Sequence, residues 1–339
     1  MKKVYILFAL IIAAVIFGGC REISVETIIN SDGSFTRVIT ISGDSSDVIK
    51  KNLPYPIDDS WTSSFEKDST ESDKFIQKYT KNFENDIQLN KEIENDTSWW
   101  KRIKRSIDIS KNSGFFYSYI TYNETIDAAN PFINVDYKDY LSTSDMLWLT
   151  GKRLALNSAD SVLLKNAEDK AENYLKVAYT DEIIELLKEG IKEIGNPSIK
   201  VDLVEQFRDS IETKVDSWSY DSLSEFVDYF SKLTGEEEIK KINQLKASEI
   251  KNFDLGIELL YKVFEMEDYT VVVVAPGLLT NTNSPSIVGN HVKWQVGTMS
   301  FLFEDYTMMV ESRVVNYWRF VLTGVILVIL AIVLLAKWK

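Results

Sequence analysis

Cysteine and histidine are almost missing from this 339-residue chain, which contains one of each, Cys20 and His291. A single cysteine cannot form an internal disulfide, and one cysteine with one histidine cannot supply a Cys₂His₂ or Cys₄ zinc site. A Ser-His-Asp triad would have to use His291, and the sequence has no Gly-x-Ser-x-Gly nucleophile motif. The 14 glycines form neither a P-loop nor a Gly-x-Gly-x-x-Gly motif. The sequence therefore predicts no catalytic, metal-binding or cofactor-binding residue.

Basic residues are also in deficit, with 38 Lys and Arg against 51 Asp and Glu, for a net charge of −13. An acidic surface repels DNA, RNA and anionic lipid headgroups at long range. The densest basic stretch is Lys101–Arg105, and its alternation is typical of one solvated face of a strand. We therefore expect no nucleic-acid partner.

The N-terminus has the outline of an export signal. Two lysines follow Met1, residues 4–17 are apolar, and Gly18, Gly19 and Cys20 come next. This pattern is typical of a bacterial lipoprotein signal, in which the cysteine is acylated and becomes the new N-terminus, so Cys20 is the predicted lipidation site. The 14-residue run is short for a span, which needs about 17–25 apolar residues. An uncleaved anchor and a buried segment remain the alternatives.

A second apolar run, Phe320–Ala336, carries no charge and predicts a transmembrane helix. At about 1.5 Å per residue it is about 25 Å long, at the short end for a bilayer. Aromatic residues flank it as in interfacial belts, and the predicted membrane-interface residues are Tyr317, Trp318 and Trp338. If the export signal carries the residues before this run across the membrane, Lys337 and Lys339 beyond it lie in the cytoplasm, in agreement with the positive-inside rule. The alternative, a buried core helix, is disfavoured because the run has no polar face.

Alternating patterns predict strands in the first part of the chain. Residues 22–42 read as a hairpin that turns at Ser31–Gly33, with Phe35, Arg37, Ile39 and Ile41 alternating on the return strand. Further strands are predicted at 61–65, 74–83, 103–109 and 115–122, with a short helix at 86–94.

The periodicity changes to helical from about residue 160 to 267. Leu163, Ala167, Ala171, Tyr174 and Ala178 recur at intervals of three and four residues. After this stretch, strands are predicted at 269–274, 292–296 and 306–315, with a polar loop at 281–290. A sheet that stops and resumes indicates an insertion.

The predicted fold class is therefore α+β, an antiparallel β-sheet domain interrupted by an α-helical insertion and followed by a C-terminal transmembrane helix. The predicted parts are a lipoprotein-type signal peptide (1–19), the β-rich first part of the ectodomain (20–139), the helical insertion (140–267), the β-rich return (268–316), and the transmembrane helix with a short basic tail (317–339).

Short motifs at both ends of the predicted ectodomain resemble a known family. They are Cys20, Ser24–Ile29, Ser31–Gly33, Val274–Gly277, Gly289–Asn290 and Val292–Trp294. Together with a terminal membrane helix, they resemble the LppM-like bacterial lipoproteins over the first 125 mature residues and the last 70, but not over the helical middle. The resemblance implies an envelope β-rich domain that handles lipids or lipid-linked glycans, and it transfers no catalytic residue.

Two further sets of residues are weighed as sites. Trp99 and Trp100 are adjacent, and adjacent residues in a strand face opposite ways, so one exposed ring could stack on a carbohydrate or contact lipid headgroups. Burial of both is the more common outcome. Asp58 and Asp59 are a guess at an acid/base pair, and a solvated turn is the simpler interpretation.

The leading hypothesis is a non-enzymatic, membrane-anchored extracytoplasmic module of the cell envelope that binds a lipid, glycolipid or protein partner. One alternative is a cell-wall glycan hydrolase, which needs two carboxylates about 5–9.5 Å apart in a cleft. The other is a structural subunit of an envelope membrane complex, for which the small residues Thr323 and Gly324 in the span are the sequence hint.

Overall fold

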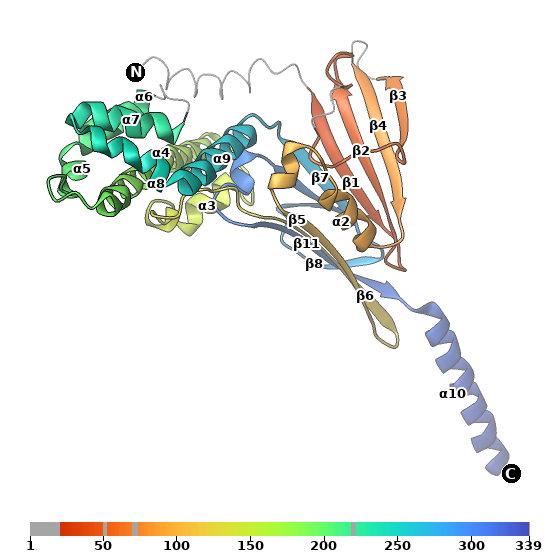
Figure 1. The fold of residues 1–339 in the computed structure, drawn as a ribbon. Helices are drawn as coiled ribbons and strands as arrows, with labels where there is room; N and C mark the ends of the chain where they lie inside the picture. The colour runs from red at the N-terminus through yellow and green to blue at the C-terminus, as the bar shows by residue number, and fades with distance from the viewer. Residues whose placement is uncertain (1–20, 50–52, 70–73, 218–221, 339) are drawn as a thin grey trace. The chain divides into compact units, whose positions relative to one another are not determined.

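The computed structural model (Figure 1) describes residues 21–49, 53–69, 74–217 and 222–338. The predicted signal peptide and the predicted lipidation site, Cys20, lie outside these residues. The chain divides into two compact units, which we name by content. The helical unit comprises Ala128–Glu267 and Gly297–Glu304. The sheet unit comprises the described residues of Gly19–Asp127, Asp268–Val296 and Asp305–Lys339.

The first sheet of the sheet unit, sheet A, has the strand order β3-β4-β2-β1-β7-β10-β9. The strands are β1 (Glu22–Ile29), β2 (Phe35–Gly43), β3 (Thr62–Lys67), β4 (Phe75–Phe83), β7 (Tyr269–Val274), β9 (Ser286–Val288) and β10 (His291–Val296). The predicted hairpin at 22–42 is confirmed as β1 and β2, which pair in antiparallel register. By contrast, β1 pairs with β7 in parallel, from Ile23 opposite Tyr269 to Ile28 opposite Val274.

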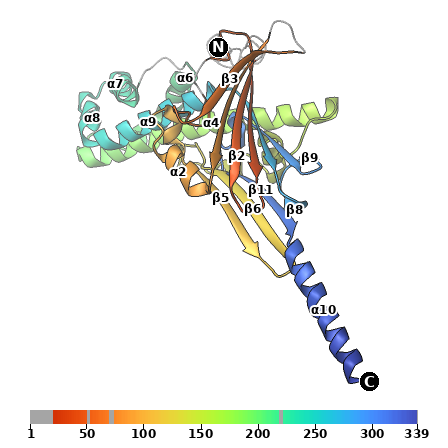
Figure 2. The ribbon, with the colours of Figure 1, turned by 90° about the vertical axis from the view of Figure 1, so that its right-hand side faces the viewer.

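The remaining strands of the unit form a second sheet, sheet B, in the order β5-β6-β11-β8. They are β5 (Arg105–Ser113), β6 (Tyr117–Ile126), β8 (Leu278–Thr282) and β11 (Tyr306–Val315). Figure 2 shows β5, β6 and β11 with the terminal helix continuing from β11. The chain changes from sheet A to sheet B at Gly277, whose φ is +75° and whose Cα lies against the backbone of Arg313 on β11. A glycine is required here because a Cβ would lie 2.5 Å from the Arg313 carbonyl oxygen.

Asn283, between β8 and β9, bonds to both sheets. Its Oδ1 accepts from the indole Nε1 of Trp294 on β10 at 3.2 Å and from the backbone N–H of Met309 on β11 at 3.0 Å. The prediction of a loop at 281–290 is partly wrong, because the end of β8 and all of β9 lie within this range. Polar composition conceals these strands because both are short edge strands that are mostly exposed.

Two short helices also belong to the sheet unit. The predicted helix at 86–94 is confirmed as α2 (Asp86–Glu94), which the side chain of Asn85 caps by accepting from the backbone N–H of Gln88. A 3₁₀ helix, η1 (Trp99–Arg102), lies between α2 and β5. Of the stretch predicted as a basic strand, Lys101–Arg105, the first two residues are therefore helical and only Arg105 lies in a strand, β5.

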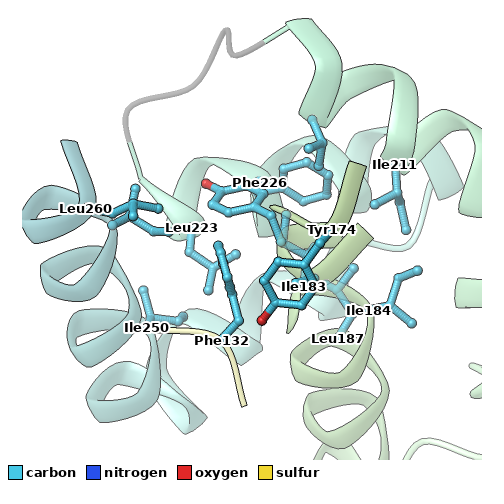
Figure 3. Close-up of a cluster of buried hydrophobic side chains, with 14 of the residues drawn as sticks. Phe132, Tyr174, Ile183, Ile184, Leu187, Ile211, Leu223, Phe226, Ile250 and Leu260 are labelled. Carbon is cyan, nitrogen blue, oxygen red and sulfur yellow. The ribbon is translucent and has the colours of Figure 1, made fainter. Parts of the chain in front are cut away.

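The helical unit is built around one long helix, α4 (Ser158–Ile194), which ends at Gly195 in the left-handed region. The other helices are α3 (Thr143–Leu149), α5 (Asp202–Gln206), α6 (Arg208–Ser217), α7 (Leu223–Thr234), α8 (Ile242–Leu245) and α9 (Ala247–Phe264), with 3₁₀ helices η2 (Tyr137–Asp139), η3 (Glu237–Lys241) and η4 (Thr298–Ser300). Figure 3 shows Tyr174, Ile183, Ile184 and Leu187 of α4 facing residues of the neighbouring elements in one apolar core.

The predicted fold class is confirmed: the chain combines antiparallel strand pairs with a long helical insertion and ends in a C-terminal apolar helix, α10 (Tyr317–Lys337). The parallel β1–β7 pair and the division into two sheets go beyond what the alternating patterns could show, because strand patterns do not identify pairing partners.

Candidate functional site

The helix α10 is the strongest functional feature of the described structure. It has 21 residues, and within the described part of the chain it is the one helix long and apolar enough to cross a membrane. None of its residues is buried. Transfer of one large apolar side chain from water into an apolar environment is favourable by about 1.5–3 kcal/mol. A fully exposed helix of such residues is therefore unfavourable in water. By length and composition α10 could therefore anchor the chain in a membrane.

The predicted interface residues lie at the two ends of α10. Tyr317 and Trp318 are in its first turn and are 75% and 62% exposed, while Trp338 directly follows it and is 92% exposed. Their positions fit two aromatic belts about one helix length apart. The predicted lipidation site, Cys20, lies outside the described residues, so its role stays a prediction.

A cluster of charged and phenolic side chains is buried between sheets A and B. Arg37 on β2 and Glu124 on β6 form an ion pair of 2.9 Å between Nη2 and Oε2, and both side chains are 0% exposed. Arg37 also donates from Nε to the Thr27 hydroxyl and from Nη2 to the Tyr122 hydroxyl, each at 3.1 Å. The ion pair therefore connects the facing surfaces of the two sheets.

Arg105 and Tyr55 complete the surroundings of Glu124. The Arg105 Nε lies 3.7 Å from Glu124 Oε1, and the Tyr55 hydroxyl donates to the same oxygen. Arg105 Nη2 also donates to the Tyr269 hydroxyl at 2.8 Å. The guanidinium carbons of Arg37 and Arg105 lie 4.3 Å and 4.4 Å from the centroid of the Tyr55 ring, within the range of cation–π attraction.

The charges of this cluster fix its protonation. Burial by itself would raise the pKa of Glu124, but the charges of Arg37 and Arg105 and the hydrogen bonds from Tyr122 and Tyr55 together hold the pKa below its usual value. Burial raises the pKa of Tyr269 to about 12. Glu124 is thus ionised and Tyr269 neutral at neutral pH. Because a catalytic side chain must reach its substrate, we interpret this solvent-excluded cluster as a structural link between the sheets.

The tryptophan pair lies beside this cluster and not in a strand, so the expectation of opposite faces is wrong. Trp99 and Trp100 are both on η1, with ring centroids 4.4 Å apart in a stacked arrangement. Trp100 is buried and packs edge-on against Tyr269 with centroids 6.4 Å apart. Trp99 is half-buried. Their proposed ligand contact remains a prediction, and the observed contacts give Trp100 a packing role.

The remaining candidate catalytic residues, His291, Asp58 and Asp59, are exposed. His291 begins β10 at the surface. Asp58 and Asp59 lie in an exposed turn, where the Asp58 carboxylate accepts hydrogen bonds from the Ser60 side chain and backbone N–H. These hydrogen bonds lower the pKa of Asp58, whereas a glycosidase acid needs a raised pKa. Among the described residues, no group of three or more His, Cys, Asp or Glu side chains is arranged to hold a metal ion.

An open groove of about 440 Å³ lies on the helical unit. Its lining is Asn243, Ala247, Ile250, Lys251, Asp254, Leu255 and Glu258, from α8 and α9. The Oδ1 of Asn243 is buried and accepts no hydrogen bond from a described residue, while its Nδ2 donates to Asp228 at 3.0 Å. Burial raises the pKa of Asp254, whose Oδ1 accepts from the backbone N–H of Leu223 at 2.9 Å. Periodicity identified α9, but it could not show that this face remains open.

No protein-family model matches the chain, and no curated protein matches it. A comparison with solved structures finds the folded domain of LppM from Mycobacterium tuberculosis, determined by NMR. The match covers 88% of this chain and 92% of that domain, with 8% sequence identity and a TM-score of 0.28. It names the family that the short motifs resemble, but similarity at this level carries no further argument, and the resemblance stays an expectation.

Proposed function

We propose that this chain is a membrane-anchored, extracytoplasmic binding or interaction module of the bacterial cell envelope and not an enzyme. The observation that carries the proposal is α10, an apolar helix with no buried residue that continues after one residue from a strand of a folded sheet. A helix of this composition is stable when lipid covers it.

The orientation follows from the two ends of the chain. An export signal ending at Cys20 places the folded units outside the cytoplasm. Lys337 and Lys339 then lie on the cytoplasmic side of α10, in agreement with the positive-inside rule. With Cys20 acylated, the chain would be anchored in the membrane at both ends, by the lipid and by α10.

The groove on α8 and α9 is the proposed ligand site. Its polar lining residues, among them Asn243, Asp254 and Glu258, suit a ligand that carries hydroxyl or amide donors. Ile250 and Leu255 add apolar contacts. The headgroup of a glycolipid combines these properties, and we take it as the first candidate and a protein segment as the second.

The anchor is tested by fractionating bacterial membranes that contain four forms of the full chain: unchanged, Cys20→Ser, Leu327→Arg with Leu330→Arg, and the triple variant. Each central arginine disfavours insertion by roughly 2.5–3.5 kcal/mol. We expect Cys20→Ser to lose the mass of the lipid and to keep residues 1–19, because its processing needs the cysteine. The triple variant should be released into the soluble fraction once residues 1–19 are replaced by a cleaved secretory signal. The matched control is Leu327→Ala with Leu330→Ala, which should remain in the membrane. Recovery of the unchanged chain from the cytosol, with its first nineteen residues attached, would contradict the proposal.

The ligand is tested by mass spectrometry of lipids and proteins that co-purify with the intact, membrane-extracted chain. Ala247→Trp fills the groove, and Ser248→Trp places the same ring at the next exposed position outside its lining. We expect Ala247→Trp, and not Ser248→Trp, to lose the co-purifying molecule. A hydrolysis assay on cell-wall glycans belongs to the same experiment, because Asp254 and Glu258 lie one helical turn apart in the groove. Glycan cleavage that Asp254→Asn abolishes would overturn the non-enzymatic assignment.

A further inference from the structure

The turn between β5 and β6 is bonded directly to the start of α10. The backbone N–H of Asn316, the residue before the helix, donates to the carbonyl of Phe116 at 2.8 Å. The Asn316 side chain donates from Nδ2 to the carbonyl of Gly114 at 3.1 Å and to that of Phe115 at 3.3 Å. Arg319 donates to the Gly114 carbonyl as well. The hairpin tip and the first turn of α10 therefore form one local unit.

Aromatic contacts strengthen this connection. The rings of Phe116 and Phe320 have centroids 4.5 Å apart, and Tyr117 packs edge-on against Phe320 at 6.0 Å. The guanidinium carbon of Arg319 lies 5.4 Å from the centroid of the Phe115 ring. Phe115 is nevertheless 53% exposed, between Gly114 and Phe116 at the tip of the turn.

The level of the tip relative to a bilayer follows from the length of α10. Its uncharged part, Phe320–Ala336, is about 25 Å long, at the short end for a hydrocarbon core of about 30 Å. The uncharged run begins at Phe320, so in a spanning helix Phe320 lies at the edge of the hydrocarbon and Tyr317 and Trp318 at headgroup level. Rings in contact with Phe320 and Arg319 must lie at about the same level.

We propose that the β5–β6 tip, Gly114–Phe116, inserts into the bilayer interface beside α10 and forms a second, non-covalent contact with lipid. The inference rests on the proposed function, because it requires α10 to span the membrane. Phe115 enters the boundary between headgroups and acyl chains, and Arg319, held by Gly114, remains among the headgroups. Sheet B is thereby fixed at the membrane surface through two attachments, the strand β11 and the hairpin tip.

The test uses the full chain in vesicles of phosphatidylethanolamine and phosphatidylglycerol with lipids brominated on the acyl chains. Substituting Cys20→Ser leaves no other cysteine, so an environment-sensitive fluorophore can be attached at Phe115→Cys, at Asp108→Cys, or at Leu330→Cys. Asp108 is exposed on β5, seven residues from Phe115 and about 24 Å away along an extended strand. Leu330 reports whether α10 itself is inserted.

We expect severalfold stronger quenching at positions 330 and 115 than at 108, with a blue-shifted emission at 115. Quenching at 330 with none at 115 would overturn the inference and leave the anchor intact. Equal quenching at 115 and 108 would also overturn it, because the sheet would then lie along the surface. No quenching at 330 would remove the anchor, and with it this inference.

Discussion

Arg37 and Glu124, from strands of two different sheets, form an ion pair of 2.9 Å in which neither side chain is exposed to solvent. Burying two charges is costly, and the pair recovers that cost only with close geometry and further hydrogen bonds. Thr27, Tyr55 and Tyr122 supply these bonds. Removing one charge of the pair is therefore expected to destabilise the fold by much more than the pair contributes net to the free energy of folding.

We expect Glu124→Gln to lower the free energy of unfolding by about 3–5 kcal/mol, because it leaves Arg37 and Arg105 buried without a counter-charge. Urea unfolding of the full chain in detergent, followed by near-ultraviolet circular dichroism, measures the loss. Glu205→Gln is the matched control, since Glu205 pairs with Lys188 and Arg208 on an exposed surface and should cost at most about 1 kcal/mol. Equal losses in the two variants would contradict the role of the buried pair.

The same pair predicts a loss of stability in acid. The pKa of Glu124 is lower in the folded chain than in the unfolded chain, despite burial, because Arg37 and Arg105 favour the ionised form. Its contribution is therefore complete above the unfolded pKa and is lost as pH falls from about 4.5 through the lower, folded pKa. Unfolding free energies measured between pH 7 and pH 3 should fall less steeply in Glu124→Gln than in the unchanged chain. Parallel curves for the two proteins would count against this origin.

A close helix contact gives a third prediction. A Cβ on Gly190 of α4 would lie 2.6–2.8 Å from side-chain carbons of Ile242 on α8. Alanine favours a helix over glycine by about 1 kcal/mol, whereas overpacking costs about 1–3 kcal/mol, so we expect Gly190→Ala to be net destabilising. A double-mutant cycle with Ile242→Ala should show a favourable coupling of about 0.5–3 kcal/mol in thermal or urea unfolding. Additive effects would mean that the two residues do not constrain each other.

The crossing between the sheets gives a fourth prediction. Gly277 and Gly289 both have positive φ, +75° and +65°, but a Cβ would clash with the Arg313 backbone only at Gly277. Gly289→Ala should cost about 1–2 kcal/mol for the left-handed conformation alone. Gly277→Ala should cost about 1–3 kcal/mol more, because the backbone of β11 cannot move aside as a side chain can. Similar unfolding midpoints for the two variants would show that the chain does not need the close approach at Gly277.

Local periodicity was sufficient for the elements with strong patterns and insufficient for the pairing between them. The hairpin of β1 and β2, the helix at 86–94 and the buried positions Ala167, Ala171 and Tyr174 follow from spacing alone. Leu163 belongs to the same spacing but is 48% exposed, whereas the next residue, Leu164, packs against the core. Periodicity indicates a face, and only the fold decides where that face is covered.

The buried cluster shows the same limit. Arg37 occupies an inward position between Phe35 and Ile39, and Glu124 an inward position between Tyr122 and Ile126. Each is a charged residue on an apolar face, a signal that can be read from the sequence. That the two meet cannot be read, because pairing across two sheets depends on the whole topology. The groove on α8 and α9 could not be predicted from the sequence either, because its existence depends on the spacing of neighbouring helices.

The parallel pairing of β1 with β7 determines when the sheet unit can fold. Ile23 lies opposite Tyr269, and the whole insertion is synthesised between them. A topology with such distant partners has a high contact order and folds slowly. Until residue 269 emerges, one edge of β1 remains open to strands of other chains. The native pairing of sheet A can therefore form only after the whole helical insertion and β7 have been made, so the first hairpin of the chain waits for nearly all of the rest.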